Sequence, residues 1–326
     1  MTNARGLLLA LLLLVALPCL VAAQSGNDDA RAKGIEVRAG PAAVFLVLYL
    51  VSTLIMWFLW FRNGRQGYML NLLVGMLCMT IGLLLRVKDN YAWQFLFTFL
   101  SPCAFLANDY VVLKRLSRAL GTDISSSCLF ISPRGIVWIF ILSDVITFCA
   151  QTVGTVFVIV GGKWSSLGQN IAIAGLALQL VSFALFTRLL STLAKRLRSR
   201  FPHVYYHNSG RRLRPWSKGP VTDVRTLLLV LGLTCIGILI RSVFRLIEQA
   251  DGFFGYIATH EAFLYAFDTA PLWLSLSFFC LVWPPRYIGG CAGAQESVLL
   301  RERGTAFKRS KQTAFKRYKA RQAALT

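Results

Sequence analysis

Ionisable residues that could carry chemistry are rare in this apolar sequence, and they gather late in the chain. Arg241 and Arg245 are four residues apart and Glu248 follows three later, a spacing that places all three on one face of a helix. The next apolar run holds three polar residues at positions i, i+4 and i+7, which again share one helix face: Glu261, Tyr265 and Asp268. Two basic residues on one helix would therefore oppose a pair of acids on the next.

This arrangement of opposite charges has two interpretations. An ionisable side chain at membrane depth is costly, so each of these residues needs a partner or a task. In the first interpretation they form a structural network of ion pairs that locks two neighbouring helices together. In the second they form a polar wall that contacts the head group of a substrate or relays protons. The residue types and their spacing agree with both.

Fewer polar residues lie in the middle of the chain. Asp144 and Gln151 are seven residues apart and nearly share a helix face, and Gln179 lies in the following apolar run. A glycine accompanies each glutamine, with Gly154 three residues after Gln151 and Gly175 four residues before Gln179. Small residues in such places are typical of helices that approach closely inside a membrane. Asp144 and the two glutamines join the candidate residues of a substrate path.

Helices that cross a membrane must position these residues. The chain has 326 residues, of which 56% are apolar and only 15% are charged. Seven runs reach or approach the about 20 residues that a hydrocarbon core of about 30 Å requires. They cover residues 41–61, 68–87, 92–113, 134–160, 169–190, 224–247 and 262–283. We therefore predict an all-α, polytopic membrane protein whose seven transmembrane helices occupy residues 41–285. Asp109, near the end of the third run, is expected simply to reach the membrane interface.

Residues 1–23 have the pattern of a signal peptide. Arg5 precedes an apolar run from Leu7 to Leu17, and Val21-Ala22-Ala23 is a small-residue end of the kind that a signal peptidase accepts. The apolar run is about half the length of a spanning helix, so we predict cleavage after residue 23. The alternative is a short anchor that is not cleaved. Residues 24–40 would then form a short extracytoplasmic segment.

The net charge indicates orientation. The 35 Lys and Arg against 14 Asp and Glu give a formal charge of +21, but a chain this apolar is neither disordered nor typical of a nucleic-acid-binding domain. With the N-terminus outside, the cytosolic segments hold 26 of the basic residues and the outside segments six. This excess agrees with the positive-inside bias, so the C-terminus is predicted to be cytosolic. Residues 286–326 then form a basic tail, whose Phe307 and Phe315 would help to hold it on anionic lipids of the inner leaflet.

No pattern indicates an enzyme, a cofactor or a metal. Gly161-Gly162-Lys163 lacks the earlier glycine of a phosphate-binding loop, and no Ser/His/Asp arrangement suggests hydrolysis. His203 and His207 are too weak a pair to predict a metal site. The cysteines lie in apolar runs or cytosolic segments, so no structural disulfide is expected, and Cys291 is a candidate for palmitoylation. Nucleic acid is not an expected partner, and no oligomeric state is predicted.

Several of these residues match the pattern of a known family. In the fourth and fifth spans the matching positions are Asp144, Gln151, Gly154, Gly175 and Gln179. The most specific match runs through the last two spans, at Arg241, Arg245, Glu248, Gly252, His260, Glu261, Tyr265, Asp268 and Pro271. Over roughly residues 41–285 the chain resembles the fungal lipid-translocating exporter family, the RTA-like proteins named for resistance to aminocholesterol. It departs from the family at Met79 and Leu83, where the family often has an acidic residue and a tyrosine.

The resemblance implies a seven-helix protein that exports amphipathic lipids, or moves them toward the outer leaflet, and so confers resistance to toxic amphiphiles. Sphingoid bases, sterol-like amines and tetrapyrroles are the candidate cargo, and the plasma membrane, or alternatively an endomembrane, is the expected location. A cationic amphiphile would need an acidic lining in an otherwise apolar path. Four acids are available for that role: Asp144, Glu248, Glu261 and Asp268.

A seven-helix receptor or a lipid or stress sensor is the alternative from another class. An outside N-terminus, a long basic loop at 188–225 and a basic tail fit such a protein, which would signal through that loop and tail. Against it, Asn108-Asp109-Tyr110 lacks the adjacent arginine that is common at the end of the third span of G-protein-coupled receptors. The seventh span also lacks their Asn-Pro-x-x-Tyr motif. We therefore favour a transporter.

Overall fold

The structure is a computed structural model that describes residues 39–88, 91–121, 124, 127–128, 133–160, 164–205, 221, 223–251 and 261–293. All regular structure in this part of the chain is helical. The long helices are α2 (Ala39–Arg62), α3 (Leu70–Val87), α4 (Tyr91–Ala119), α6 (Pro133–Val160), α7 (Ser165–Arg200) and α9 (Val224–Asp251). The last long segment joins α11 (Glu261–Phe263), the π-helix η2 (Leu264–Thr269) and α12 (Ala270–Leu281). The short α8 (Pro202–Tyr205) follows α7, and residues 284–293 form a further helix.

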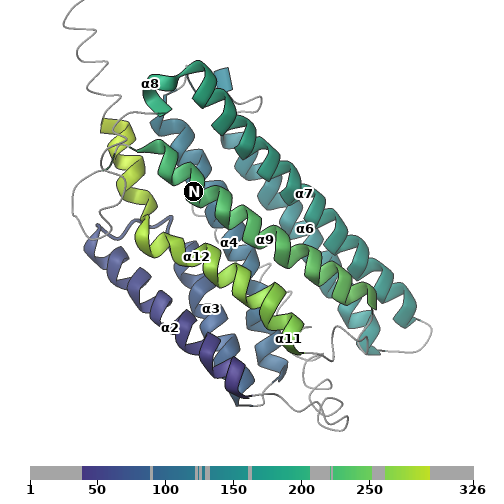
Figure 1. Ribbon diagram of the computed structural model, residues 1–326. Helices are drawn as coiled ribbons and strands as arrows, with labels where there is room; N and C mark the ends of the chain where they lie inside the picture. Colours follow the sequence, from purple (N-terminus) through teal and green to yellow (C-terminus); the bar gives the residue numbers. More distant parts are fainter. Residues whose placement is uncertain are drawn as a thin grey trace, which may run out of the picture.

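The long helices form one bundle, in which neighbours along the chain are also neighbours in space (Figure 1). α2 packs on α3, α3 on α4, α4 on α6, α6 on α7, α7 on α9 and α9 on α12, and α12 returns to α2. The helices thus form a closed ring, and α4 also contacts α9 across it. Sequential elements commonly pack side by side in this way when the connections between them are short.

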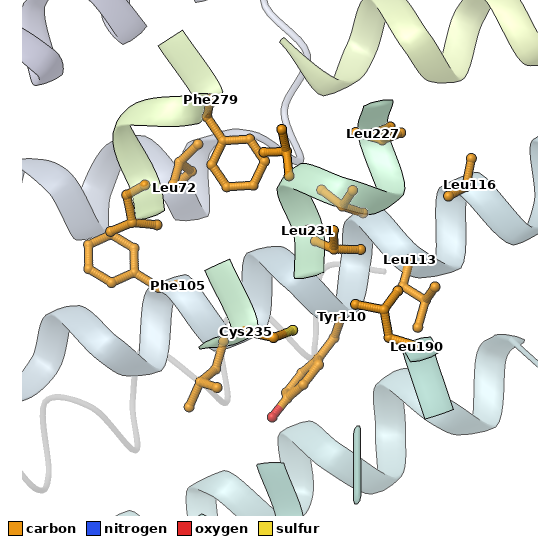
Figure 2. Close-up of a cluster of buried hydrophobic side chains, with 14 of the residues drawn as sticks. Leu72, Phe105, Tyr110, Leu113, Leu116, Leu190, Leu227, Leu231, Cys235 and Phe279 are labelled. Carbon is orange, nitrogen blue, oxygen red and sulfur yellow. The ribbon is translucent and has the colours of Figure 1, made fainter. Parts of the chain in front are cut away.

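The interior is apolar, and so is the outer surface. Figure 2 shows a buried cluster drawn from α3, α4, α7, α9 and α12, in which Leu72, Phe105, Tyr110, Leu231 and Phe279 are labelled. Large apolar side chains also face outward, among them Val47, Leu54, Trp138, Leu142 and Leu185. Because lipid is as apolar as these side chains, burial alone does not hold such helices together. Close packing and polar contacts between the helices must do so.

Six helices are long and apolar enough to cross a membrane, judged by length and composition within the described residues. They are Gly40–Arg62, Leu70–Val87, Gly135–Val158, Ser165–Arg200, Val224–Asp251 and Leu264–Leu281. The chain is therefore a multi-pass, all-α membrane protein, as the sequence predicts.

The third predicted run forms α4, which is not one of these six although it has 29 residues. Its buried polar residues include Asn108, Asp109 and Ser117, and it packs against α3, α6 and α9. A helix enclosed by other helices does not need an apolar surface on every side, which explains its more polar composition. The prediction of seven spans depends on this helix.

The packed part of the chain continues past the predicted boundary at residue 285. In the helix of residues 284–293, Tyr287 and Cys291 are buried, and the carbonyl of Arg286 accepts a hydrogen bond of 3.2 Å from the N–H of Val221. Burial raises the pKa of the Cys291 thiol to about 12, so the thiol is both protonated and shielded. This environment argues against the predicted palmitoylation of Cys291.

Some predictions concern residues outside the described ranges. They are the signal peptide of residues 1–23, His207 in the basic loop, the loop residues Gly252 and His260, and the tail beyond residue 293 with its two phenylalanines.

Candidate functional site

The most strongly charged group in the bundle surrounds Asp268 of η2. Arg245 Nε donates a hydrogen bond of 2.6 Å to Asp268 Oδ1, and Arg241 Nη1 forms an ion pair of 3.1 Å with Asp268 Oδ2. Asp268 is 1% exposed and the Arg241 side chain 5%, so this contact is sequestered from solvent. One buried carboxylate therefore holds two arginines, and it joins α9 to the last helical segment.

The same group extends toward a more open position. Arg245 Nη1 also donates a 3.0 Å hydrogen bond to Glu248 Oε2, three residues along α9. The side chains of Arg245 and Glu248 are 26% and 22% exposed. Two arginines thus meet two acids, and their formal charges balance. We call Arg241, Arg245, Glu248 and Asp268 the ion-paired cluster.

Contacts from three further helices converge on this region. The Tyr49 hydroxyl of α2 donates a hydrogen bond of 3.2 Å to the carbonyl of Thr269. On α3, Arg86 Nε donates a hydrogen bond of 3.0 Å to the hydroxyl of Tyr265, whose ring stacks on Phe45 with centroids 5.5 Å apart. On α4, the carbonyl of Thr98 accepts a 3.1 Å hydrogen bond from Arg241 Nη2. The last helical segment is therefore held by polar contacts from α2 and α3, and Arg241 extends the cluster to α4.

The structure changes one premise of the predicted pattern. Residues 264–269 form a π-helix, so the α-helical spacing assumed for Glu261, Tyr265 and Asp268 does not hold. Tyr265 and Asp268 are both buried, and the hydroxyl of Tyr265 accepts a hydrogen bond from Arg86 of α3. Glu261 begins α11, and its side chain lies outside what the structure describes. π-helical turns are rare and are frequent at functional sites.

A second polar group lies on α4 and α6. The hydroxyl of Tyr110 donates a hydrogen bond of 2.8 Å to Asp144 Oδ2, and its ring packs between Phe140 and Phe186 at centroid distances of 5.5 and 4.6 Å. Figure 2 shows the Tyr110 ring at the edge of the apolar cluster, with its oxygen pointing away from the labelled side chains. Asp144 is 7% exposed. The candidate Asp144 is therefore bound by a tyrosine hydroxyl in an aromatic setting.

Asp109 corrects the sequence prediction. It was expected to reach the membrane interface, but it is 1% exposed and its Oδ2 accepts a hydrogen bond of 3.0 Å from the hydroxyl of Thr234 on α9. The reason is that α4 continues to Ala119, so Asp109 lies ten residues before its end and faces a neighbouring helix. Arg86, at the end of the run of residues 68–87, and Tyr49, inside the run of residues 41–61, were not predicted as site residues. Asp109 and Asp144 are both within electrostatic reach of Tyr110, and we call them the carboxylate pair.

The two glutamines bind each other. Gln151 Nε2 of α6 donates a hydrogen bond of 2.7 Å to Gln179 Oε1 of α7. A Cβ at Gly154 would lie 2.6 Å from the carbonyl oxygen of Gly168, and a Cβ at Gly175 would lie 3.0 Å from the Gln151 side chain. The predicted close approach of these two helices is confirmed. The glutamines thus serve first as a contact between α6 and α7.

The candidate residues therefore form separate groups. Of the four acids predicted to line one path, Asp268 and Glu248 belong to the ion-paired cluster, and Asp144 belongs with Asp109. Cys103 on α4 lies within electrostatic reach of both Asp144 and Arg241, so this part of α4 lies between the two groups. Within the described ranges, no three His, Cys, Asp or Glu side chains come together as a metal site would require.

Comparison with known proteins assigns the family. A model of the family described as RTA1 like protein matches residues 72–290, about two thirds of the chain. The chain belongs to the RTA1-like family. The matched segment contains the carboxylate pair, the glutamine contact and the ion-paired cluster, whereas Tyr49 and Phe45 precede it.

Three relatives from Saccharomyces cerevisiae are similar to this RTA1-like chain. Protein RTM1 is 30% identical over 190 residues, which are 58% of this chain and 56% of the relative. Protoporphyrin uptake protein 1 is 28% identical over 189 residues, 58% and 57% of the two chains. Protein RTA1 is 28% identical over 196 residues, 60% of this chain and 56% of the relative. The alignments thus span a little over half the length of each relative. No solved structure matches this chain.

Proposed function

We propose that this RTA1-like protein moves amphipathic lipids and similar toxic amphiphiles across the membrane toward the outer leaflet, and thereby confers resistance to them. The observation that carries the proposal is the ion-paired cluster. It runs from the buried Arg241 and Asp268 to the partly exposed Arg245 and Glu248, inside a bundle whose interior is mostly apolar. An amphiphile presents the same combination of one charged end and an apolar body.

We propose seven spans, with α4 as the third. The N-terminus would then lie outside and the C-terminus in the cytosol, as the distribution of basic residues indicates. In support, the end of α7, the start of α9 and the helix of residues 284–293 lie at one end of the bundle (Figure 1). At that end Arg196 and Arg200 donate hydrogen bonds to the carbonyls of Cys128 and Ser127, at 3.3 and 3.1 Å. The described residues that flank the basic segments thus lie at one end of the bundle, and we propose that the protein is in the plasma membrane with its basic tail on anionic lipids.

The cargo proposed is a cationic or zwitterionic amphiphile, with sphingoid bases and sterol-like amines as the first candidates. Arg245 and Glu248 are the charged side chains with the most exposure in the cluster, so we propose that they meet the head group first. One relative is named for the uptake of protoporphyrin, which is movement in the inward direction. The direction of transport is therefore part of the test. The proposed activity is transport without a chemical step and needs no cofactor.

The test is transport of a fluorescent sphingoid base by cells with and without the gene. Cells loaded with the base should release it faster when the protein is present, and the rate of uptake should not rise. Equal release in both strains, with normal amounts of protein at the surface, would sink the proposal. Faster uptake instead would reverse the direction. A ligand-evoked signal without any change in transport would support the alternative of a receptor or sensor.

Variants of the acidic residues refine this test. Asp144→Asn and Glu261→Gln should each reduce release while the protein still reaches the surface. Glu248→Gln should do so at little cost in stability, because its side chain is partly exposed. A matched control is Gln169→Leu, which removes a weak 3.4 Å hydrogen bond to the Gln249 carbonyl and no charge. If the acidic variants all released the base at the wild-type rate, the acidic side chains would have no part in transport.

A further inference from the structure

The carboxylate pair differs from Asp268 and Glu248 because no cation is paired with it among the described residues. Asp109 is held by the hydroxyl of Thr234 and Asp144 by the hydroxyl of Tyr110. Within the described residues, neither aspartate forms an ion pair. Both hydrogen bonds come from neutral donors, so nothing in their immediate contacts balances a negative charge.

Each of these carboxyl groups also has an oxygen without a partner. Asp109 Oδ1 and Asp144 Oδ1 are buried and make no hydrogen bond among the described residues. Asn108, which is 0% exposed, lies beside the Asp109 carboxyl group, yet neither polar atom of its side chain completes a hydrogen bond of good geometry. A buried amide with both polar atoms free, next to an under-coordinated carboxyl group, is unusual in a folded protein.

A bare carboxylate in an apolar interior is too costly to persist. Such a group is neutralised by a proton or by a cation that enters the site. We infer that Asp109 and Asp144 form a proton-binding site, in which each is held as a neutral acid in the conformation described. A proton suits the site because each free oxygen can accept it without any rearrangement of the surrounding side chains.

The surroundings of the pair are mostly neutral. From α4, Tyr110 and Cys103 lie near Asp144, and from α9, Cys235 lies near Asp109. Among the described residues, Arg241 of α9 is within electrostatic reach of Cys103, and its own ion pair is with Asp268. The α7 residues at this point are apolar or carry a hydroxyl, such as Phe186 beside Tyr110 and Thr187 beside Cys235.

If the proposed function holds, the proton-binding site can release a proton when a cationic cargo binds. This step rests on the proposed function. When the cationic head group of an amphiphile reaches a carboxyl group of the pair, the O–H bond breaks, the proton leaves to water, and the carboxylate that remains binds the cation. One positive charge enters as one positive charge leaves. The protein would therefore exchange protons for a cationic cargo, with Asp109 and Asp144 as the exchanging groups.

Infrared spectroscopy tests the proton-binding site without any transport. The full chain in a detergent without ester groups, at neutral pH, should show the carbonyl stretch of protonated carboxyl groups, which is resolved from that of carboxylates. Asp109→Asn and Asp144→Asn should each lower the area of this band, and the double variant should lower it by the sum. Glu248→Gln is the matched control and should leave it unchanged, because Glu248 is ion-paired. A wild-type protein without this band, or a double variant with the full band, would overturn the inference.

Vesicles test the exchange. The protein is reconstituted into vesicles that contain a pH-sensitive dye, and a fluorescent amphiphile with a quaternary ammonium group is added. Because this probe carries no proton, any protein-dependent pH change must come from the protein. The wild-type protein should transport the probe across the vesicle membrane and change the internal pH. In Asp144→Asn most of this pH change should be lost.

The outcomes separate the two proposals. Probe movement with no pH change in the wild type would overturn the exchange and leave transport standing. A protonated band that the variants remove, in a protein that moves no probe, would overturn the proposed function and leave the proton-binding site standing. Wild-type pH changes that persist in the double variant would overturn the assignment to Asp109 and Asp144.

Discussion

Two groups of buried acids in one bundle are stabilised in opposite ways. In the ion-paired cluster Asp268 is held by two arginines, whereas in the carboxylate pair Asp109 and Asp144 each have only a hydroxyl donor. The first arrangement satisfies its charges internally, so opening it would strand several ions at once. The carboxylate pair leaves one oxygen of each acid without a hydrogen-bond partner, so each acid can still bind a proton. The comparison indicates that paired charges fix this fold and that unpaired acids are the ones available for exchange.

Replacing an aspartate by asparagine should have very different effects on stability in the two groups, and the larger effect is expected at Asp268. Asp268→Asn should destabilise the protein by about 3–5 kcal/mol, because Arg241 is then buried without the acid that it pairs with. The expected result is a large fall in the amount of protein that stays monodisperse when heated in mild detergent. Pairing it with Arg241→Met should restore part of the loss, since the double variant no longer contains a stranded charge. Wild-type stability of Asp268→Asn alone would contradict a structural role for the cluster.

Arg245→Ala should have the next largest effect. Asp268 keeps its ion pair with Arg241, and the partly exposed Glu248 can be solvated, so we expect a loss of about 2 kcal/mol. The thermal stability and the yield of the purified protein measure it. Arg188→Ala on the exposed side of α7 is the control for removing an arginine, and it should change neither quantity. A loss of stability as large as that of Asp268→Asn would mean that Arg245 alone accounts for the stabilising effect of the cluster.

Tyr110→Phe should have a smaller effect on stability. It removes one hydrogen bond to Asp144 and keeps the ring between Phe140 and Phe186, which suggests a loss of about 1 kcal/mol. The comparison with Tyr110→Ala, which also removes the ring, separates the hydroxyl from the packing. Equal losses in the two variants would show that the ring contributes nothing.

Asp144→Asn should change stability least. An amide has nearly the shape of a protonated carboxyl group, so we expect a change below about 1 kcal/mol. Thermal unfolding of this variant beside Asp268→Asn measures the contrast directly. A loss of several kcal/mol at Asp144 would remove the difference between the two groups, because it would show that the negative charge itself is needed there.

Local spacing was sufficient to predict the charges that meet. Arg241, Arg245 and Glu248 share a helix face because positions four and three apart always do, and the next apolar run supplied Asp268. The close approach of α6 and α7 was equally predictable, because Gly154 and Gly175 leave no side chain between the helices. Both predictions needed only contacts between consecutive helices.

Features that depend on three or more helices were not predictable. The burial of Asp109 follows from the enclosure of α4 by α3, α6 and α9, and no residue pattern along the chain contains that arrangement. Arg86 reaches Tyr265 across 179 positions of sequence. The π-helix was likewise not predictable, since the six residues of η2 have no composition that would by itself exclude an α-helix.

The π-helix makes the ion-paired cluster sensitive to chain length. A turn with i→i+5 hydrogen bonds holds one residue more than an α-helical turn, so η2 behaves as a one-residue insertion in the last helical segment. Deleting a single exposed residue there, such as Ala266, would restore an α-helical turn and leave Tyr265 and Asp268 two positions apart instead of three, so that their side chains would no longer keep the same relative directions. A one-codon deletion or insertion would therefore suffice, during evolution, to separate Tyr265 from its contacts without any substitution at the charged positions.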